Sequence, residues 1–466
     1  MTLERALIEI ERIAGSGAVL RDPDLRAAYS HDEREAEPRL ADAIVRIERL
    51  EGLAEIVKIA ADHGVPITPR GAGTGRVGGA VPVSGGIVLA MERINSIVEI
   101  DRAEGVAIVE PGVVLGDLHA AVEAEGLFYP PDPNSLSSCT IGGNIACNAG
   151  GPRAFKYGVT RNYILSLDAI TGAGERLSVG KPTVKGVTGY DLAGLIVGSE
   201  GTLGLIERAR LRLIPRPEAV RTLLVFLPDD KSVGEAISAT LARGVTPRCL
   251  ELIDSVALGL MKRDAGVAIP EGAEAMLLVE LDGEEAALDR ELERVAEAFY
   301  GAGAIEILSA QSNTERERLW AARRELSRTL RGLARFKLSE DIVVPRRRIF
   351  DLLRRCREIS EAHEIVMPTY GHAGDGNLHV NFLWDDPELR PRVDRAIEAL
   401  FRATIEMGGT LSGEHGIGVL KAPYLPLEQS PGLIDLQRRI KALFDPAGVL
   451  NPGKIFPAER RGHGEC

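Results

Sequence analysis

The spacing of apolar and polar positions divides the chain into regions of different secondary structure. In the first half, short runs rich in Val and Ile, such as residues 87–90 and 106–109, predict strands between glycine-rich turns. Apolar residues recur at helical spacing at about 50–63 and 115–126, so we expect amphipathic helices there. The first half therefore predicts short strands alternating with helices.

The pattern changes at residues 215–217, where two prolines interrupt both helix and strand and predict a domain boundary. Beyond it, apolar runs at 223–226 and 276–281 predict strands. Longer charged stretches at 284–301 and 314–334 predict helices with Glu and Arg toward solvent. This alternation predicts an α+β domain with an antiparallel sheet.

Length and composition are those of an ordinary multidomain globular protein. At 466 residues the chain is too long for one hydrophobic core, so we expect two or three domains. The net charge of −12 argues against a nucleic-acid partner, because nothing offsets repulsion from phosphates. No apolar run approaches the ~18 residues of a membrane span. The N-terminus reads as an amphipathic helix and lacks the apolar segment of a signal peptide.

The cysteines form an odd number and show no C-x-x-C spacing. Disulfide bonds are therefore not expected, and a reducing cytoplasm is the default compartment. The spacing also excludes an iron–sulfur cluster on this chain, because such clusters need several spaced thiolates. The five cysteines are Cys139, Cys147, Cys249, Cys356 and Cys466.

Three glycine-rich segments lie in the first half. Residues 73–78 match G-x-G-x-x-G after a predicted strand, but residues 79–86 cannot start a regular helix, so a Rossmann site is excluded. Such a loop can still bind a diphosphate through its backbone N–H groups, and the alternative is a plain surface loop. Residues 130–151 and 198–204 add Ser, Thr and Asn among further glycines. Together the three segments predict a large, polar, phosphate-bearing cofactor.

Two glycine-rich segments near the C-terminus contain three of the eight histidines. His372 and His379 flank the turn sequence at 374–377, which can bring both rings to one point despite their odd spacing. Glu414 would complete a two-histidine, one-carboxylate set that suits zinc, manganese or iron. The adjacent His415 could act as a base. The alternative is a group of turn histidines bonded to the backbone, but three of them flanked by glycine favour a metal site.

In combination these motifs resemble the flavin domain of the vanillyl-alcohol-oxidase type. The C-terminal motifs are similar to one branch of it, which holds D-lactate dehydrogenases, the glycolate oxidase flavin subunit and D-2-hydroxyglutarate dehydrogenases. The resemblance covers about residues 35–457. The segments that carry it are 69–75, 140–144, 198–204, 371–379, 412–416 and 451–454.

The resemblance implies the fold class α+β. It implies a two-subdomain FAD-binding domain of the vanillyl-alcohol-oxidase type and an α+β substrate domain, or cap, with an antiparallel sheet and a helical C-terminal segment. We expect an N-terminal helical segment at residues 1–35 and the FAD-binding domain at 36–215. The cap with the metal site is expected at 216–410, and the segment completing the active site at 411–466.

The resemblance also implies FAD without a covalent link, since no histidine lies between His63 and His119 to tether it. The diphosphate is expected on residues 70–75. The residues implied for FAD binding are Pro69, Arg70, Gly71, Ala72, Gly73, Thr74, Gly75, Gly78, Pro133, Ser135, Thr140, Gly142, Gly143, Asn144, Ala146, Gly150, Gly201, Ile206 and Asn451.

Relatives place a divalent metal on the positions of His372, His379 and Glu414. Arg323 matches a position that contacts the substrate carboxylate, and the alternative is a solvent-facing helix arginine. Lys337 is a second, weaker candidate for that contact, because the chain departs from some relatives in the residues that follow it.

The implied reaction is FAD-dependent oxidation of a D-2-hydroxy acid of the glycolate, D-lactate or D-2-hydroxyglutarate type to the 2-oxo acid. The substrate would chelate the metal, His415 would remove the hydroxyl proton, and a hydride would pass to flavin N5. Electrons would leave to an acceptor other than a nicotinamide: a quinone, a cytochrome, an electron-transfer flavoprotein or an iron–sulfur subunit.

Several alternatives stay open. The chain could be the flavin subunit of a multi-subunit glycolate oxidase complex, or a homodimer, and it could lie at a membrane through a partner. Some relatives of the same fold use FAD without net oxidation to make an ether-lipid precursor. From a different class, the chain could be a metal-dependent hydrolase with structural glycine-rich loops.

Overall fold

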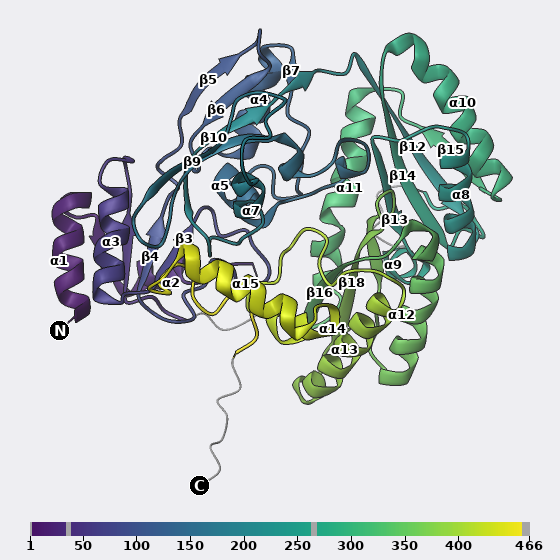
Figure 1. Ribbon diagram of the computed structural model, residues 1–466. Helices are drawn as coiled ribbons and strands as arrows, with labels where there is room; N and C mark the ends of the chain where they lie inside the picture. The colour runs from purple at the N-terminus through teal and green to yellow at the C-terminus, as the bar shows by residue number, and fades with distance from the viewer. Residues whose placement is uncertain (1, 34–38, 262–267, 459–466) are drawn as a thin grey trace.

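The structure is a computed structural model, and it describes residues 2–33, 39–261 and 268–458. Cys466 and parts of the segments expected at 1–35 and 411–466 lie outside the described residues. Figure 1 shows the N-terminal helices at one end, the green part of the chain at the other, and the yellow C-terminal segment between them. None of the described helices is both long and apolar enough to cross a membrane.

The first sheet has the strand order β1-β2-β4-β3, with β2, β4 and β3 parallel and β1 antiparallel. Helix α3 ends at His63 because Gly64 takes a left-handed conformation (φ 63°) and caps it. A segment near the C-terminus also contacts this sheet, since Leu450 forms a parallel β-bridge with Ile67 of β3. The elements are α1 (Thr2–Ala14), β1 (Val19–Leu20), α2 (Pro23–Tyr29), β2 (Ala43–Arg46), α3 (Leu53–His63), β3 (Ile67–Arg70) and β4 (Ile87–Ala90).

The second sheet is antiparallel with the order β5-β6-β10-β8-β9, and helices α4, α5 and α7 share its apolar core. A two-stranded sheet of β7 and β11 lies beside it. The elements are β5 (Ile97–Asp101), β6 (Val106–Val109), α4 (Leu115–Ala124), β7 (Leu127–Phe128), α5 (Ile141–Cys147), α6 (Ala154–Tyr157), β8 (Ile164–Ile170), β9 (Arg176–Gly180), α7 (Leu192–Ile196), β10 (Leu205–Arg212) and β11 (Ile214–Pro215).

The third large sheet is fully antiparallel, with the order β15-β12-β14-β13-β17-β18-β16. Its strands are β12 (Ala219–Leu227), β13 (Cys249–Ile253), β14 (Ala275–Gly283), β15 (Glu306–Ser309), β16 (Phe336–Val343), β17 (Thr369–His372) and β18 (Asn377–Trp384). The helices around it are α8 (Asp230–Ala242), α9 (Ser255–Met261), α10 (Glu285–Gly301), α11 (Asn313–Arg331), α12 (Ile349–His363), α13 (Arg390–Glu406), α14 (Leu425–Glu428) and α15 (Pro431–Phe444).

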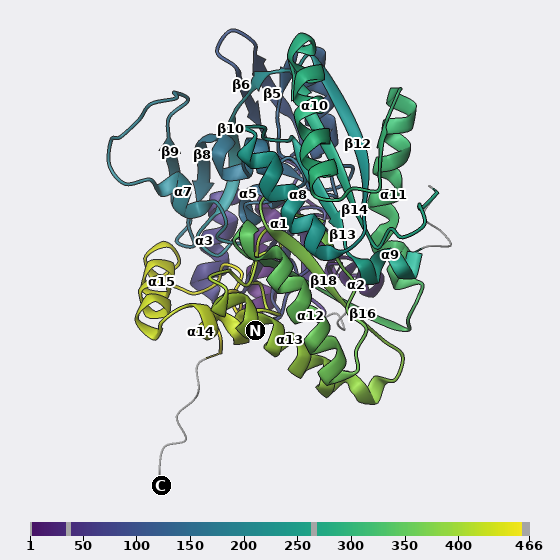
Figure 2. The same ribbon diagram turned by 90° about the vertical axis from the view of Figure 1, so that its right-hand side faces the viewer.

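The two faces of this third sheet differ in chemistry. On one face, alternate residues such as Leu378, Val380 and Phe382 join a core with α8, α10, α12 and α13. The residues between them, such as His379, point to the other face, where α11 lies. Figure 2 shows α10 and α11 on opposite sides of β12 and β14. The candidate site is built on the α11 face.

The sequence predicted these elements well. The helices expected at 50–63 and 115–126 are α3 and α4, and those at 284–301 and 314–334 are α10 and α11. The antiparallel sheet after residue 215 is confirmed. Residues 79–86, which follow the G-x-G-x-x-G segment, contain no helix. This agrees with the exclusion of a Rossmann site.

Candidate active site

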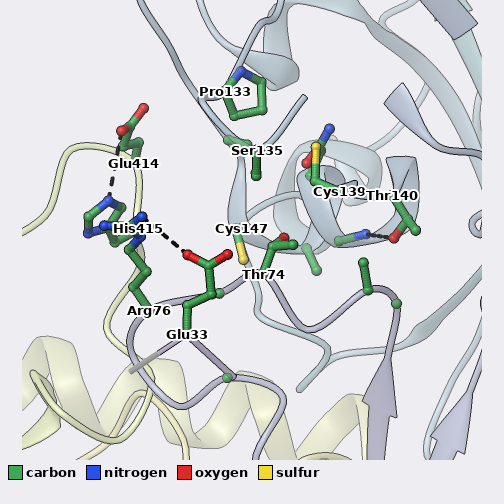
Figure 3. A pocket seen from close by; sticks show the side chains of 18 of the residues that line it. Glu33, Thr74, Arg76, Pro133, Ser135, Cys139, Thr140, Cys147, Glu414 and His415 are labelled. Atoms are coloured by element: carbon green, nitrogen blue, oxygen red, sulfur yellow. Dashed lines mark hydrogen bonds and ion pairs between the residues drawn. The ribbon is translucent and has the colours of Figure 1, made fainter. Parts of the chain in front are cut away.

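One cleft runs between the glycine-rich loops and the third sheet. Its walls come from the loop after β3, the segment around α5, the start of β10, α11, the β17–β18 hairpin and the loop of Glu414 and His415. Figure 3 shows Glu414 and His415 at one end of this pocket, with Cys139 and Thr140 toward the other. The predicted FAD residues that line it are Pro69, Arg70, Gly71, Ala72, Gly73, Thr74, Gly75, Pro133, Ser135, Thr140, Gly142, Gly143, Asn144, Ala146, Gly150, Gly201 and Ile206.

The loop at 71–75 has the properties of a phosphate cradle. Within the part of the chain that the structure describes, its backbone N–H groups have no hydrogen-bond acceptor. Gly73 is left-handed (φ 73°), and a Cβ at Gly71 would lie 2.2 Å from Thr140 Oγ1. Asn144 Nδ2, across the cleft, is buried without a partner. Unpaired N–H donors, on a loop whose close packing leaves no room for a side chain at Gly71, fit a diphosphate-bearing cofactor such as FAD.

Two predicted FAD residues, Gly78 and Asn451, do not line the cleft. The Gly78 N–H donates to Asp32 Oδ2 at 2.7 Å. Asn451 Nδ2 donates to the carbonyls of Gly79 (2.9 Å) and Glu200 (2.7 Å). Both residues therefore contact neighbouring parts of the fold and not the cleft itself.

The cradle makes a testable prediction. In Gly73→Ala the new Cβ would lie 2.2 Å from the Arg70 guanidinium, and the residue would keep a left-handed backbone. Because such strain costs about 1–3 kcal/mol, we expect FAD affinity to fall about tenfold or more, measured by flavin absorbance against free FAD. Gly64→Ala is the matched control, since Gly64 is left-handed with no atom within 4 Å of the added Cβ. Equal FAD affinity in the two variants would contradict the cradle.

The β17–β18 hairpin brings His372 and His379 to one face of the sheet. Tyr370 pairs with His379 and His372 with Asn377, so both rings project toward α11. Glu414 approaches from the C-terminal loop. One ligand atom from each of His372, His379 and Glu414 lies within 4.8 Å of the other two.

The geometry around Glu414 fits a divalent cation. Its Oε1 lies 3.4 Å from His379 Nε2, 3.7 Å from His372 Nε2 and 3.8 Å from His415 Nε2. Glu414 Oε2 is buried without a hydrogen-bond partner. Converging imidazole nitrogens beside an unpaired carboxylate oxygen form the donor set of zinc, manganese or iron.

Glu251 on β13 orients His372. Its Oε1 lies 2.6 Å from His372 Nδ1, and its Oε2 lies 2.6 Å from Arg323 Nη2. Burial alone would raise its pKa, but His372 and Arg323 lower the pKa to about 2, so Glu251 is ionised. His372 then donates from Nδ1 and turns Nε2 toward Glu414. Sequence reasoning missed Glu251, although a glutamate inside the apolar strand Cys249–Ile253 was a usable signal.

Arg323 is buried and lines the cleft, so it is not a solvent-facing arginine. Its guanidinium lies 4.9 Å from the centre of the Tyr370 ring, and its Nε has no partner. Lys337 is buried behind this wall, where its Nζ donates to Ser327 Oγ at 2.8 Å. Lys337 is not among the residues that line the cleft, whereas Ser327 is.

His415 lies against the cluster of His372, His379 and Glu414, and it lines the cleft. Its ring stacks on His379, with the ring centres 5.3 Å apart. Burial lowers the pKa of His415 below its ordinary value, which favours the neutral imidazole that a base requires.

Comparison with known proteins identifies the family of the chain. Residues 41–180 match the family of FAD binding domains, and residues 216–455 match the family described as FAD linked oxidases, C-terminal domain. The chain is 39% identical to the glycolate oxidase subunit GlcD of Bacillus subtilis, covering 94% of this chain and 93% of that protein. It is 33% identical to a D-lactate dehydrogenase of Anaerostipes hadrus (94% of each chain) and to a D-2-hydroxyglutarate dehydrogenase of Stutzerimonas stutzeri (98% and 100%).

Solved structures show the fold. A 4-ethylphenol oxidase from Gulosibacter chungangensis superposes with a TM-score of 0.80 at 20% identity, covering 99% of this chain and 98% of that one. A p-cresol methylhydroxylase gives 0.79 at 16% identity, covering 97% and 96%. The predicted α+β fold of the vanillyl-alcohol-oxidase type is therefore confirmed. The chain belongs to the FAD-linked oxidase family and is an FAD-linked oxidoreductase.

Proposed function

We propose that this protein oxidises a D-2-hydroxy acid to the 2-oxo acid, with FAD and a divalent metal bound in the cleft. The observation that carries the proposal is the convergence of His372, His379 and Glu414 at one end of the cleft that the glycine-rich loops line. The two sites adjoin, since a Cβ at Gly150 would lie 3.3 Å from Glu414 Oε2. The names of the relatives support the substrate class: glycolate, D-lactate or D-2-hydroxyglutarate.

The cofactors and the protein have separate tasks. Bound FAD would accept the hydride, and a divalent metal on His372, His379 and Glu414 would polarise the substrate hydroxyl. His415 would take the hydroxyl proton at Nε2, which lies on the Glu414 side of its ring. Its stacking on His379 holds the ring in place for that transfer.

Arg323 would bind the substrate carboxylate. Its Nη2 is committed to Glu251, but its buried Nε has no partner and remains a donor for a substrate oxygen. Lys337 would add positive charge behind Ser327 and Tyr370, on the same wall of the cleft.

Replacing Arg323 tests this clamp. Since a hydrogen bond to a charged group contributes about 1.5–3 kcal/mol, we expect Arg323→Met to lower kcat/KM about 10- to 100-fold, mainly through KM. Arg328→Met is the matched control on the same helix, because the Arg328 side chain is 81% exposed and pairs with Glu325 on the helix surface. Similar losses in both variants would argue against a specific clamp.

The electrons would leave to a quinone, a cytochrome, an electron-transfer flavoprotein or an iron–sulfur subunit. The Bacillus subtilis and Escherichia coli relatives are each named as a subunit of glycolate oxidase, which supports a partner protein. Membership of an FAD-linked oxidase family removes the basis for a hydrolase with structural glycine-rich loops.

Turnover with an artificial dye acceptor tests the proposed reaction. Glycolate, both enantiomers of lactate and both enantiomers of 2-hydroxyglutarate are supplied in turn, and the 2-oxo acid is quantified. We expect a 2-oxo acid from at least one of these substrates, with the D-enantiomer preferred where the acid is chiral. If no substrate yields a 2-oxo acid, the proposed function is wrong.

A further inference from the structure

We propose that two buried carboxylates from different parts of the fold, Asp341 and Glu200, position the loop at 412–418 that carries Glu414 and His415. The proposal rests on the proposed function for the roles of those two residues. The loop has neither helix nor strand, so its backbone N–H groups need acceptors from elsewhere. Asp341 accepts the first three from Gly413 onward, Glu200 accepts those of Ile417 and Gly418, and Ser412 Oγ accepts that of Gly416.

Asp341, on β16, holds the first part of the loop. It is fully buried, and its Oδ2 accepts the backbone N–H groups of Gly413 (2.9 Å), Glu414 (3.1 Å) and His415 (3.0 Å). The same oxygen accepts the Ser412 hydroxyl at 2.7 Å. Four donors on one carboxylate oxygen fix the direction in which the backbone presents the metal ligand and the base.

The other oxygen of Asp341 ties the loop to the histidine hairpin. Asn377, the first residue of β18, donates from Nδ2 to Asp341 Oδ1 at 2.6 Å. Gly413 packs against the same amide, since a Cβ there would lie 2.4 Å from Asn377 Nδ2. Asp341 therefore links the segment that carries Glu414 to the strand that carries His379.

Glu200, in the glycine-rich loop before β10, holds the second part. It is buried, its Oε1 accepts the Ile417 N–H at 2.8 Å, and its Oε2 accepts the Gly418 N–H at 2.8 Å. Its own backbone is left-handed (φ 53°), which is unfavourable for a glutamate and persists only where the surroundings hold it. Glu200 and its neighbour Gly201 both line the cleft.

The two contacts have different consequences. Asp341 sets Glu414 and His415 relative to the metal-binding hairpin, whereas Glu200 sets the same loop relative to the cofactor cradle. Both act through the backbone of the loop, so they are positioning residues and not catalytic residues. Because neighbours acting on one loop are coupled, their substitutions should not be additive.

Hydrogen exchange of the FAD-loaded protein tests, without reference to activity, whether Asp341 and Glu200 hold the loop at 412–418. In Asp341→Asn and in Glu200→Gln we expect the peptide covering 412–418 to exchange at least about tenfold faster than in wild type, while β12 and β14 stay protected. Asp230→Asn is the matched control, because Asp230 is a buried acceptor of the Ser255 N–H on α9, outside the cleft. Unchanged exchange of 412–418 in the folded variants would overturn the proposal.

A second readout separates positioning from mere stability. We expect the Zn²⁺ affinity, measured by calorimetry on chelator-treated protein, to fall about 10- to 100-fold in Asp341→Asn and to stay unchanged in Asp230→Asn. The variant that combines Asp341→Asn with Glu200→Gln should lose less Zn²⁺ affinity than the product of the factors lost in the two single variants. Faster exchange with unchanged Zn²⁺ affinity and unchanged flavin reduction would overturn the positioning role.

A milder substitution covers the case in which Asp341→Asn does not fold. Ser412→Ala removes one donor to Asp341 and the acceptor of the Gly416 N–H, so it should raise exchange in the same peptide. Failure of the proposed function would look different. Wild-type protein would then show neither Zn²⁺ binding nor flavin reduction. The exchange result would still show whether Asp341 and Glu200 hold the loop at 412–418.

Discussion

His415→Ala should reduce its bound flavin about 10²- to 10⁴-fold more slowly than wild type when mixed with a 2-hydroxy acid, the range that general base catalysis supplies. The reason is geometric: His415 Nε2 lies on the Glu414 side of the ring, stacking on His379 fixes that ring, and burial favours its neutral form. The measurement is anaerobic stopped-flow absorbance of the flavin at saturating substrate.

Two controls make the result specific. The FAD content and metal content of His415→Ala should match those of wild type, and added imidazole should restore part of the rate by entering the vacated space. His363→Ala removes a histidine from the last turn of α12, outside the cleft, and should leave the rate unchanged. A His415→Ala rate within about threefold of wild type would assign the proton transfer to another group.

Removal of the metal should have the second large effect. A metal that polarises the reacting oxygen contributes several kcal/mol, so we expect a chelator to lower the rate of flavin reduction about 10²- to 10³-fold. The flavin should stay bound, since the cradle at 71–75 and the His372–His379–Glu414 cluster occupy different parts of the cleft. Zn²⁺ or Mn²⁺ added back should restore the rate.

A ligand variant locates the metal. His379→Ala should bind Zn²⁺ weakly and resist restoration by Zn²⁺, because it removes one of the three converging donors. Full activity in protein shown to be metal-free by elemental analysis would contradict the role of this cluster. Loss of the flavin together with the metal would show instead that the cation supports folding.

Local sequence patterns predicted the parts of the site that are formed locally. The hairpin between His372 and His379 depends on the turn sequence at 374–377, and the structure pairs its strands as that turn requires. The exclusion of a Rossmann site needed only the observation that residues 79–86 cannot start a helix. Both conclusions rest on contacts between close neighbours in the chain.

Residues that act over long sequence separations could not be found in this way. The bond between Glu251 and His372 spans 121 residues, that between Asp341 and the His415 N–H spans 74, and that between Glu200 and the Ile417 N–H spans 217. Nothing in the spacing of a single sequence links such pairs. For Glu251, the local sequence offered one signal of a special role: a glutamate inside the apolar strand Cys249–Ile253.

Helical spacing also left the arginines of α11 unresolved. Arg323, Arg324 and Arg328 are close in sequence, and only packing against Tyr370 and Glu251 distinguishes Arg323. For Asn451, the sequence motif did not show which atoms its side chain contacts. Its motif resembled a cofactor contact, but the side chain bonds to loop carbonyls behind the cleft.

Anaerobic bleaching of the flavin by single 2-hydroxy acids tests the central claim most directly, because it needs no electron acceptor and no partner. The FAD-loaded, metal-loaded protein is mixed with glycolate, D- and L-lactate, D- and L-2-hydroxyglutarate and, as a substrate lacking the carboxylate, ethanol. We predict bleaching by glycolate or by a D-acid, and none by ethanol. A flavin that stays oxidised with every acid would contradict the account.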